Sequence, residues 1–378
     1  MFHPGEIWND VNGVPINAHG GGILYHEKTY WWFGEHKIAG EEGNRAHVGV
    51  HVYASENLMD WRDEGIALAV DDSPGSEIPT GCVLERPKVV FNAATGKFVM
   101  WFHLEPKGAG YAGARSGVAV ADQVAGPYQF LHSLRPNAGV WPENVAAEWR
   151  RPLEEDEERE LAALGLGGAP FPWYPKNICF RRDFEGGQMA RDMTLFVDDD
   201  GAVYHIYASE NNGTLHISLL DETLTKPAGR YVRVMPGRFH EAPAMMKWNG
   251  RYWLFSSDCT GWTPNTARLS SSSSIWGPWE EHGNPCLGEG ARIANCFESQ
   301  PTFILPVRGR ENAFIFMADR WRPRNAIDGR HVWLPLEFRH GVPVVSWLDR
   351  WELVDPEGAA GGELVSFFRS GCGGLAQV

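Results

Sequence analysis

The chain has 378 residues with 48 acidic and 34 basic side chains, which give a formal net charge of −14. This balance argues against nucleic acid as a partner, because a phosphate backbone calls for clustered Lys and Arg. It favours a neutral ligand instead. No apolar run is long enough to span a bilayer, so no membrane partner is expected. No signal peptide is visible, although one could have been removed, and the compartment stays open.

One pattern recurs five times along the chain. A glycine or polar turn flanks a run of aromatic and β-branched residues that ends on a charged or polar side chain. The five runs cover residues 30–33, 98–103, 204–210, 252–257 and 314–319. Long-period recurrence of a strand-turn-strand unit indicates a radial repeat, so we predict an all-β, five-bladed β-propeller. Its inner strands would converge on one axial funnel.

The elements expected in the first half of the chain are short antiparallel strands. A first hairpin joins residues 16–24 to 29–35, and residues 48–54 add a third strand. The second blade is expected from strands at residues 83–90, 97–103, 118–121 and 128–131. No Gly/Ser-rich or Pro-rich linker interrupts the repeats, so we expect residues 1–378 to form a single domain.

The longest gap between aromatic runs contains an insertion, at about residues 133–190. Residues 152–161 within it read as a helix, because Pro152 and an acidic first turn suit a helix start, and Gly165 or Gly167 can end it. We expect the insertion to form a lid or rim of the propeller.

Beyond the last aromatic run, further strands are expected at residues 332–336 and 344–347. Propellers commonly close by letting terminal strands share a blade, which removes a free edge. These strands could complete such a blade with the N-terminal segment.

Aromatic and sulfur-containing residues give two further indications. Most of the 17 Trp are expected to pack between blades, while two to four could stack on the apolar face of a sugar ring. The six cysteines are widely spaced and lack a CxxC pair, which favours buried free thiols over disulfides.

Four segments place polar or acidic groups beside the predicted inner strands. His19 precedes three glycines, which allow a sharp turn or a close backbone approach. This histidine is either a satisfied interior residue or a ligand contact. Glu85 and Asp192 each lie beside an Arg, which should keep them ionised, unless both are only structural ion pairs. Glu241 has no adjacent Arg or Lys and is the better candidate for a raised pKa and a general acid.

Other catalytic motifs are missing: the sequence has no Walker loop, HExxH, GxSxG or dinucleotide fingerprint. Acids on separate blades could instead flank a glycosidic oxygen across the funnel. Inverting glycosidases hold two carboxyl groups about 6.5–9.5 Å apart, which leaves room for the attacking water.

Taken together, these segments resemble family 43 of the glycoside hydrolases, a family of five-bladed propellers with inverting chemistry. The resemblance covers most of the chain outside the insertion. It implies that Glu241, in the stretch Glu-Ala-Pro-Ala-Met-Met-Lys-Trp, is the general acid. It also implies that Asp192, in Arg-Asp-Met-Thr-Leu-Phe-Val, orients this acid and tunes its pKa.

One departure from the family pattern narrows the resemblance. The family usually carries its general-base aspartate in the first blade, in an Ala-Asp-Pro-like setting, but this chain has Ala18-His19-Gly20-Gly21-Gly22 there. That variant is similar to the exo-β-1,3-galactanase branch, in which a last-blade glutamine is implicated as an unusual base. The matching residue is Gln300. Glu85 matches a further active-site glutamate, and Trp262 and Trp321 match sugar-contact loops.

The expected activity is therefore inverting, exo-acting hydrolysis of β-1,3-galactan or related plant arabinogalactan. Gln300 or Glu85 would position the attacking water. The residues expected to contact the sugar are His19, Glu35, Trp262, Asp319 and Trp321. Two alternatives remain, an α-L-arabinofuranosidase of the same fold and a carbohydrate-binding propeller without catalysis. No cofactor is expected, and a single structural ion near the propeller axis stays open, as does the oligomeric state.

Overall fold

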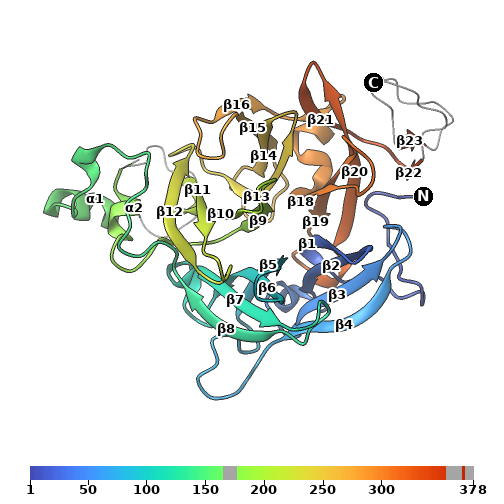
Figure 1. The fold of residues 1–378 in the computed structure, drawn as a ribbon, viewed down its shortest axis with the longest axis horizontal. Coiled ribbons are helices and arrows are strands. Elements are labelled where there is room, and N and C mark those ends of the chain that lie inside the picture. The colour runs from blue at the N-terminus through green and yellow to red at the C-terminus, as the bar shows by residue number, and fades with distance from the viewer. Residues whose placement is uncertain (165–176, 355–367, 371–378) are drawn as a thin grey trace.

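A computed structural model describes residues 1–164, 177–354 and 368–370. It shows five antiparallel sheets arranged around one axis, as the aromatic repeats predict (Figure 1). The first blade contains β1 (His19–His26), β2 (Thr29–His36), β3 (Gly49–Ser55) and β4 (Arg62–Ala69), and the second contains β5 (Val83–Asn92), β6 (Lys97–Glu105), β7 (Arg115–Ala121) and β8 (Gln129–Leu134).

The third blade contains β9 (Met193–Val197), β10 (Val203–Ser209), β11 (Thr214–Leu220) and β12 (Pro227–Val234), and the fourth contains β13 (Glu241–Trp248), β14 (Arg251–Ser257), β15 (Ala267–Ser272) and β16 (Glu280–Gly283). The fifth contains β18 (Gln300–Pro306), β19 (Phe314–Arg320), β20 (Arg330–Arg339) and β21 (Val342–Ser346), with the short β17 (Cys286–Leu287) pairing parallel to β21.

Each aromatic run lies on the second strand of its blade, namely β2, β6, β10, β14 or β19. These strands are covered on both faces by neighbouring blades, so their side chains are buried almost continuously. A strand buried on both faces selects apolar residues without alternation. The runs are therefore the hydrophobic cores of the blades, and the strands that precede them form the inner ring.

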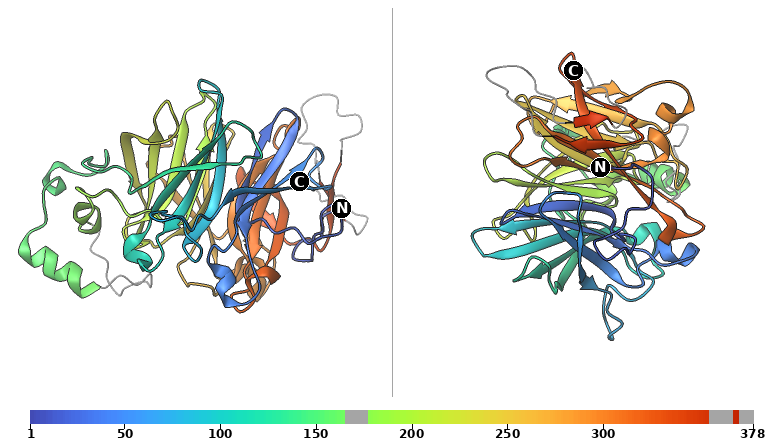
Figure 2. Two further views of the ribbon diagram at one scale, coloured as in Figure 1. Left: turned by 90° about the horizontal axis from the view of Figure 1, so that it is seen from below. Right: turned by 90° about the vertical axis from the view of Figure 1, so that its right-hand side faces the viewer.

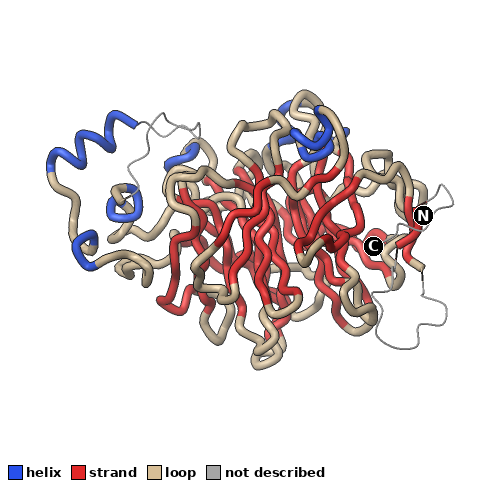
Figure 3. The backbone as a smooth tube through the Cα atoms, turned by 90° about the horizontal axis from the view of Figure 1, so that it is seen from above, coloured by secondary structure: helices blue, strands red, loops and turns tan. Residues whose placement is uncertain are grey.

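The helices lie outside the ring of strands (Figure 3). They are α1 (Glu155–Leu164), α2 (Cys179–Arg182) and α3 (Ala291–Ala294), with short 3₁₀ turns at Glu41–Asn44, Gly110–Gly113, Ala147–Trp149, Cys296–Glu298 and Ala326–Asp328. None of the described helices is long and apolar enough to cross a membrane.

The helix of the insertion starts three residues later than the sequence indicates, at Glu155, so that Pro152 precedes it. Its expected glycine stop lies outside the described residues. The described part of the insertion projects beside β12, away from the axis (Figures 1 and 2). There the Glu143 amide donates to the Tyr231 carbonyl and the Asn144 side chain to the Arg233 carbonyl.

Closure of the ring differs from the expectation. Residues 332–336 and 344–346 do form strands, but they belong to the fifth blade without help from the N-terminal segment. Phe2 instead pairs with Trp351 of β22 (Trp351–Leu353), which also pairs with β23 (Phe368–Ser370). A shared blade is unnecessary because aromatic packing joins the first and last blades.

Four of the five inner strands open with an irregularity in pairing. The register shifts after His19 in β1, Glu85 in β5, Glu241 in β13 and Pro301 in β18. A β-bulge bends its strand and re-aims a side chain. The irregularities therefore lie at the axial ends where the predicted acids stand.

Candidate active site

A pocket of about 480 Å³ lies at the ends of the inner strands where these bulges occur. Seven residues expected from the sequence line it: Glu35, Glu85, Asp192, Glu241, Trp262, Gln300 and Trp321. They come from all five blades, so the propeller brings together side chains that are up to 286 residues apart, from Glu35 to Trp321.

Glu241 is the first residue of β13, and its carboxyl group is buried beside a second acid. Burial and the charge of Asp192 raise the pKa of Glu241 to about 7, against the opposing charge of Arg191. The Arg191 guanidinium lies 3.6 Å from Glu241 Oε1. The raised pKa of Glu241 agrees with the sequence-based expectation. Its causes, however, are burial and Asp192 rather than the residues next to Glu241 in the chain. Glu241 can thus hold a proton near neutral pH.

Asp192 is fixed in place by two donors from other segments. Its Oδ2 accepts from the Ala242 amide at 3.1 Å and lies 2.9 Å from Arg86 Nε. Ala242 follows Glu241 directly and has a φ of 53°, an uncommon conformation for a residue with a side chain. Asp192 therefore holds the bulge that presents Glu241.

Arg86, in the second blade, contacts residues of three other blades across the pocket, a role that the sequence analysis missed. Besides Asp192, its Nη2 donates to Gln300 Oε1 at 2.6 Å, and its backbone amide donates to Glu35 Oε1 at 2.9 Å. The sequence suggested an ion pair with its neighbour Glu85, but the bulge at Arg86 (φ 54°) sends the two side chains to different partners.

Glu85 pairs with a buried histidine instead. Its Oε2 lies 3.2 Å from His103 Nδ1, while His103 Nε2 lies 3.2 Å from Glu105. Burial alone would raise the pKa of Glu85, but the hydrogen bond and charge of His103 outweigh it and lower the pKa to about 2. Burial conversely acts to lower the pKa of His103, yet the two carboxylates raise it to about 9. Glu85 therefore stays ionised.

Gln300 has its amide oriented by three contacts. Its Oε1 accepts from Arg86 and, at 2.9 Å, from Trp321 Nε1, while its Nε2 donates to Ser257 Oγ at 2.9 Å. Both acceptor directions of the oxygen are thus in use. Among the described residues, one N–H of the amide remains for another group.

Two tryptophans and a buried lysine complete the lining of the pocket. The Trp262 and Trp321 rings meet edge to face with centroids 6.0 Å apart, and Trp262 is 42% exposed. Lys37 Nζ lies 2.6 Å from Glu35 Oε2 and 5.7 Å from the Trp321 ring. Burial raises the pKa of Glu35, and Glu85 adds to this, whereas Lys37 opposes it.

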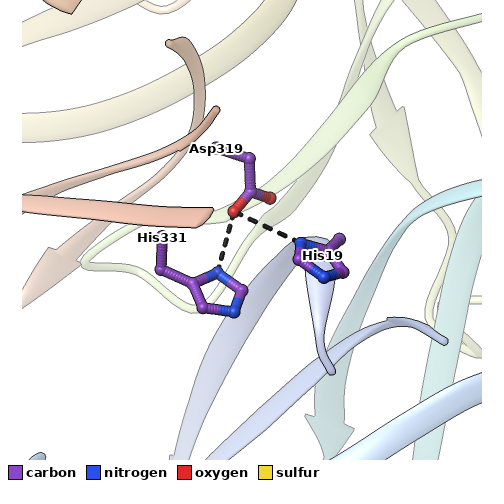
Figure 4. A group of neighbouring side chains, drawn as sticks. All are labelled: His19, Asp319 and His331. Atoms are coloured by element: carbon purple, nitrogen blue, oxygen red, sulfur yellow. Dashed lines mark hydrogen bonds and ion pairs between the residues drawn. The ribbon is translucent and has the colours of Figure 1, made fainter. Parts of the chain in front are cut away.

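His19 and Asp319 lie elsewhere. Both are buried, and neither lines the pocket. Figure 4 shows them with His331: Asp319 Oδ1 accepts from His331 Nδ1 at 2.8 Å and lies 3.8 Å from His19 Nδ1. Asp319 also accepts from the Gly20 amide. The cluster supports the first-blade bulge from behind the pocket.

The three glycines after His19 are explained by close approaches. A Cβ on Gly20 would lie 2.1 Å from Glu35 Oε1, one on Gly21 1.6 Å from the Phe33 carbonyl oxygen, and one on Gly22 2.5 Å from Lys88 Cδ. This confirms the expected close backbone approach. The glycines let β1 bring its bulge against Glu35.

Two groups of side chains contain the atom types that bind metals. They are His19, Asp319 and His331, and Glu85, His103 and Asp192; in each group the ligand atoms lie within 4.8 Å of one another. In the first group Asp319 already pairs directly with His331. Burial alone would raise the pKa of Asp319, but the two histidines outweigh it and lower the pKa. In the second group Glu85 pairs with His103, while Asp192 pairs with Arg86 outside the group.

Several pocket residues were not expected from the sequence: Lys37, Glu41, Glu42, Asn44, Arg45, Val83, Arg86, Glu105, Tyr111, Arg191 and Gly261. Three of them could have been found from their position next to predicted acids in the sequence. Lys37 follows Glu35 closely, and Arg86 and Arg191 flank Glu85 and Asp192. No pattern points to the 3₁₀ turn Glu41–Asn44 or to Tyr111, over which the Arg191 guanidinium lies at 3.9 Å.

The fold and pocket together define a propeller enzyme of the glycoside hydrolase type, with largely buried carboxyl groups and two indoles around one axis. The family model described as Glycosyl hydrolases family 43 matches residues 169–336. No curated protein matches the chain.

Three solved structures show the relationship. The GH43 β-1,3-galactosidase BT3683, with galactodeoxynojirimycin, is 47% identical over 93% of this chain and 99% of its own, with a TM-score of 0.86. An exo-β-1,3-galactanase from Phanerochaete chrysosporium, with β-1,3-galactotriose, is 32% identical over 93% of this chain and 68% of its own, with a TM-score of 0.72. Another, from Clostridium thermocellum, is 30% identical over 92% of this chain and 65% of its own, with a TM-score of 0.73.

The chain belongs to glycoside hydrolase family 43 and is a glycoside hydrolase. Its fold is the five-bladed propeller of that family.

Proposed function

We propose that this enzyme releases galactose from the ends of β-1,3-galactan chains, such as those of plant arabinogalactan, with inversion at the anomeric carbon. The observation that carries the proposal is the raised pKa of Glu241, at about 7, inside a pocket that also holds the ionised Glu85. Support for the sugar comes from the relatives, which include a β-1,3-galactosidase and exo-β-1,3-galactanases.

In the first part of the reaction, Glu241 protonates the oxygen of the departing sugar. Asp192 holds the bulge that presents this acid, and its charge helps keep Glu241 protonated. Trp262 and Trp321 offer ring surfaces to the apolar face of the sugar, while Glu35 and Lys37 offer hydrogen-bonding groups to its hydroxyls. General acid assistance is typically worth about 10²–10⁴-fold in rate.

The attacking water approaches from the opposite face of the sugar. The surroundings of the two candidates differ: Gln300 Oε1 is taken up by Arg86 and Trp321, whereas the Glu85 carboxylate is ionised. An imidic acid form of Gln300 would place a hydroxyl against two donors, which is unfavourable. We therefore assign proton acceptance to Glu85 and orientation of the water to the free N–H of Gln300.

The first test follows sugars released from β-1,3-galactan, 4-nitrophenyl β-galactoside and 4-nitrophenyl α-arabinofuranoside. Free galactose from the polymer is expected, and NMR of the first product should show the α-anomer. Release of arabinose alone would mean that the enzyme is an arabinofuranosidase. Binding without turnover would mean that the protein binds the sugar without catalysis. The β-anomer as first product would contradict inversion.

The acid is tested with Glu241→Gln, which should lower kcat on galactan by about 10²-fold or more because the amide donates no transferable proton. Glu27→Gln is the matched control, since the Glu27 side chain is 86% exposed. Unchanged hydrolysis after Glu241→Gln would refute the assignment.

The water assignment is tested by comparing Glu85→Gln with Gln300→Ala. Loss of the proton acceptor should cost about 10²–10⁴-fold in kcat, and loss of an orienting hydrogen bond about tenfold. External formate should restore activity to a Glu85→Gly variant. Rescue of Gln300→Ala instead, with none for Glu85→Gly, would reverse the two roles.

A further inference from the structure

The turn between β10 and β11 has an unusual backbone. Three consecutive residues with side chains, Glu210, Asn211 and Asn212, have φ values of 53°, 57° and 64°. L-residues visit this left-handed region as isolated residues, and each visit costs free energy. A run of three persists only where the surrounding structure holds it in place.

Separate partners hold the first two residues of the turn. The fully buried Glu210 carboxylate accepts from Arg233 Nε at 2.6 Å and Nη2 at 2.7 Å, and lies 2.8 Å from His216 Nε2. Asn211 Oδ1 accepts from Arg182 Nη1 at 3.2 Å. Arg182 belongs to α2 of the insertion, and Asp183 fixes its guanidinium with two hydrogen bonds of 2.7 Å.

The third residue of the turn reaches the catalytic acid. Asn212 is fully buried, and its Nδ2 donates to Glu241 Oε1 at 2.6 Å. Its Oδ1 has no hydrogen-bond partner within the described part of the chain. Leaving a buried carbonyl oxygen unpaired is costly, so this amide is poorly suited to stability alone.

We propose that Asn212 is a positioning residue that decides which oxygen of Glu241 carries the catalytic proton, and that the insertion braces it through Arg182. In a protonated carboxyl group the carbonyl oxygen accepts hydrogen bonds and the hydroxyl donates one. The Asn212 amide, with Arg191 3.6 Å away on the same side, makes Oε1 the accepting oxygen. The proton is then on Oε2. This inference rests on the proposed role of Glu241 as acid.

The role of the insertion follows from its position. Its described residues flank β12 and the turn, and none of them lines the pocket. The Arg182–Asn211 contact ties α2 to the strained turn directly behind Glu241. The described part of the insertion therefore acts from behind the acid. The sequence predicted a lid or rim, and no described residue of the insertion lines the pocket.

The test compares two substrates with Asn212→Ala and Asn212→Asp. On β-1,3-galactan, whose leaving sugar needs a proton, kcat should fall about 10- to 100-fold with KM nearly unchanged. On 2,4-dinitrophenyl β-galactoside, whose leaving group needs little protonation, the loss should stay below about threefold. Asn249→Ala is the control, because Asn249 has a φ of 49° but lies in an exposed turn at the far end of β13. Equal losses on both substrates would overturn the proposal.

A second readout needs no substrate. Asn212→Asp replaces an N–H donor with a carboxylate of nearly the same shape, so the pKa of Glu241 should rise. Difference titration against the same variant carrying Glu241→Gln measures this pKa. An unchanged or lower value in a folded Asn212→Asp protein would refute the inference, even if galactan proved to be the wrong substrate.

The brace is tested with Arg182→Met, which removes the contact to Asn211. A three- to tenfold loss of kcat on galactan is expected, again with little loss on the dinitrophenyl substrate. Arg151→Met is the control within the insertion, since Arg151 pairs with Glu154 and Glu157 instead. If Arg182→Met and Arg151→Met behave alike, the insertion does not act through this turn.

Discussion

Glu241 and Glu85 are carboxyl groups of one pocket whose pKa values are shifted in opposite directions, to about 7 and to about 2. Each is largely removed from solvent, which favours the neutral form of both. The difference comes from their partners, since Glu241 faces the negative Asp192 while Glu85 faces the protonated His103. An acid and an ionised carboxylate therefore coexist because the neighbours, not the residue type, decide the charge.

This difference predicts the pH dependence of the enzyme. A general acid must be protonated, and the pKa of Glu241 is about 7. Activity should be full below this value and fall as the pH rises through it, so kcat/KM should show an alkaline limb near pH 7.

A variant of Arg191 tests whether Glu241 is the group that titrates, because the positive charge of Arg191 lowers the pKa of Glu241. Arg191→Met should move the alkaline limb to higher pH. A limb that stays in place in this variant would assign the titration to another group.

At the scale of the element, the bulges of the inner strands turn side chains toward the axis. The first-blade bulge depends on glycine, because a Cβ on Gly21 would lie 1.6 Å from the Phe33 carbonyl oxygen and 2.8 Å from Gly34 Cα. Backbone atoms of a paired strand cannot move aside without breaking the sheet. Two of the other three bulges, in β5 and β13, contain Arg86 and Ala242 at positive φ. The Arg86 side chain and the Ala242 amide both bond to Asp192.

We expect Gly21→Ala to destabilise the protein by more than about 4 kcal/mol or to prevent folding, because the clash is with backbone. Urea denaturation of the purified variant measures this change. Gly186→Ala is the control, since nothing lies within 4 Å of its added Cβ and its φ is ordinary. A Gly21→Ala protein as stable as the parent would contradict the close approach of β1 and β2.

At the scale of the whole molecule, the ring must be closed between its first and fifth blades. Phe2 stacks on Trp351 with ring centroids 4.0 Å apart, and their backbones exchange two hydrogen bonds of 2.7 and 3.1 Å. Both side chains join a buried cluster with Trp32 and Trp333, one from each of the joined blades. Aromatic packing thus replaces strand exchange as the closure.

Phe2→Ala should therefore lower the unfolding free energy by about 3–5 kcal/mol, as expected for a buried Phe removed from a packed cluster. The kcat at 25 °C should be unchanged in the folded protein, because Phe2 lies away from the pocket. Thermal denaturation and an activity assay test the two parts. A lowered kcat without a lower Tm would mean that the closure acts on the site itself.

The sequence by itself determined the repeat and the chemistry at its strand ends. Strands buried on both faces must be apolar and aromatic, so the five runs predicted five blades. Acids beside such strands had to meet near the axis, which placed Glu85, Asp192 and Glu241 together. Only the tertiary structure decided which charged groups pair with one another, because ion pairs depend on distance in space. Arg86 contacts Asp192 and Gln300 instead of its chain neighbour Glu85. For the same reason, His19 and Asp319 lie outside the pocket although the sequence suggested them as sugar contacts. Asn212 reaches Glu241 from a turn that the sequence analysis did not single out.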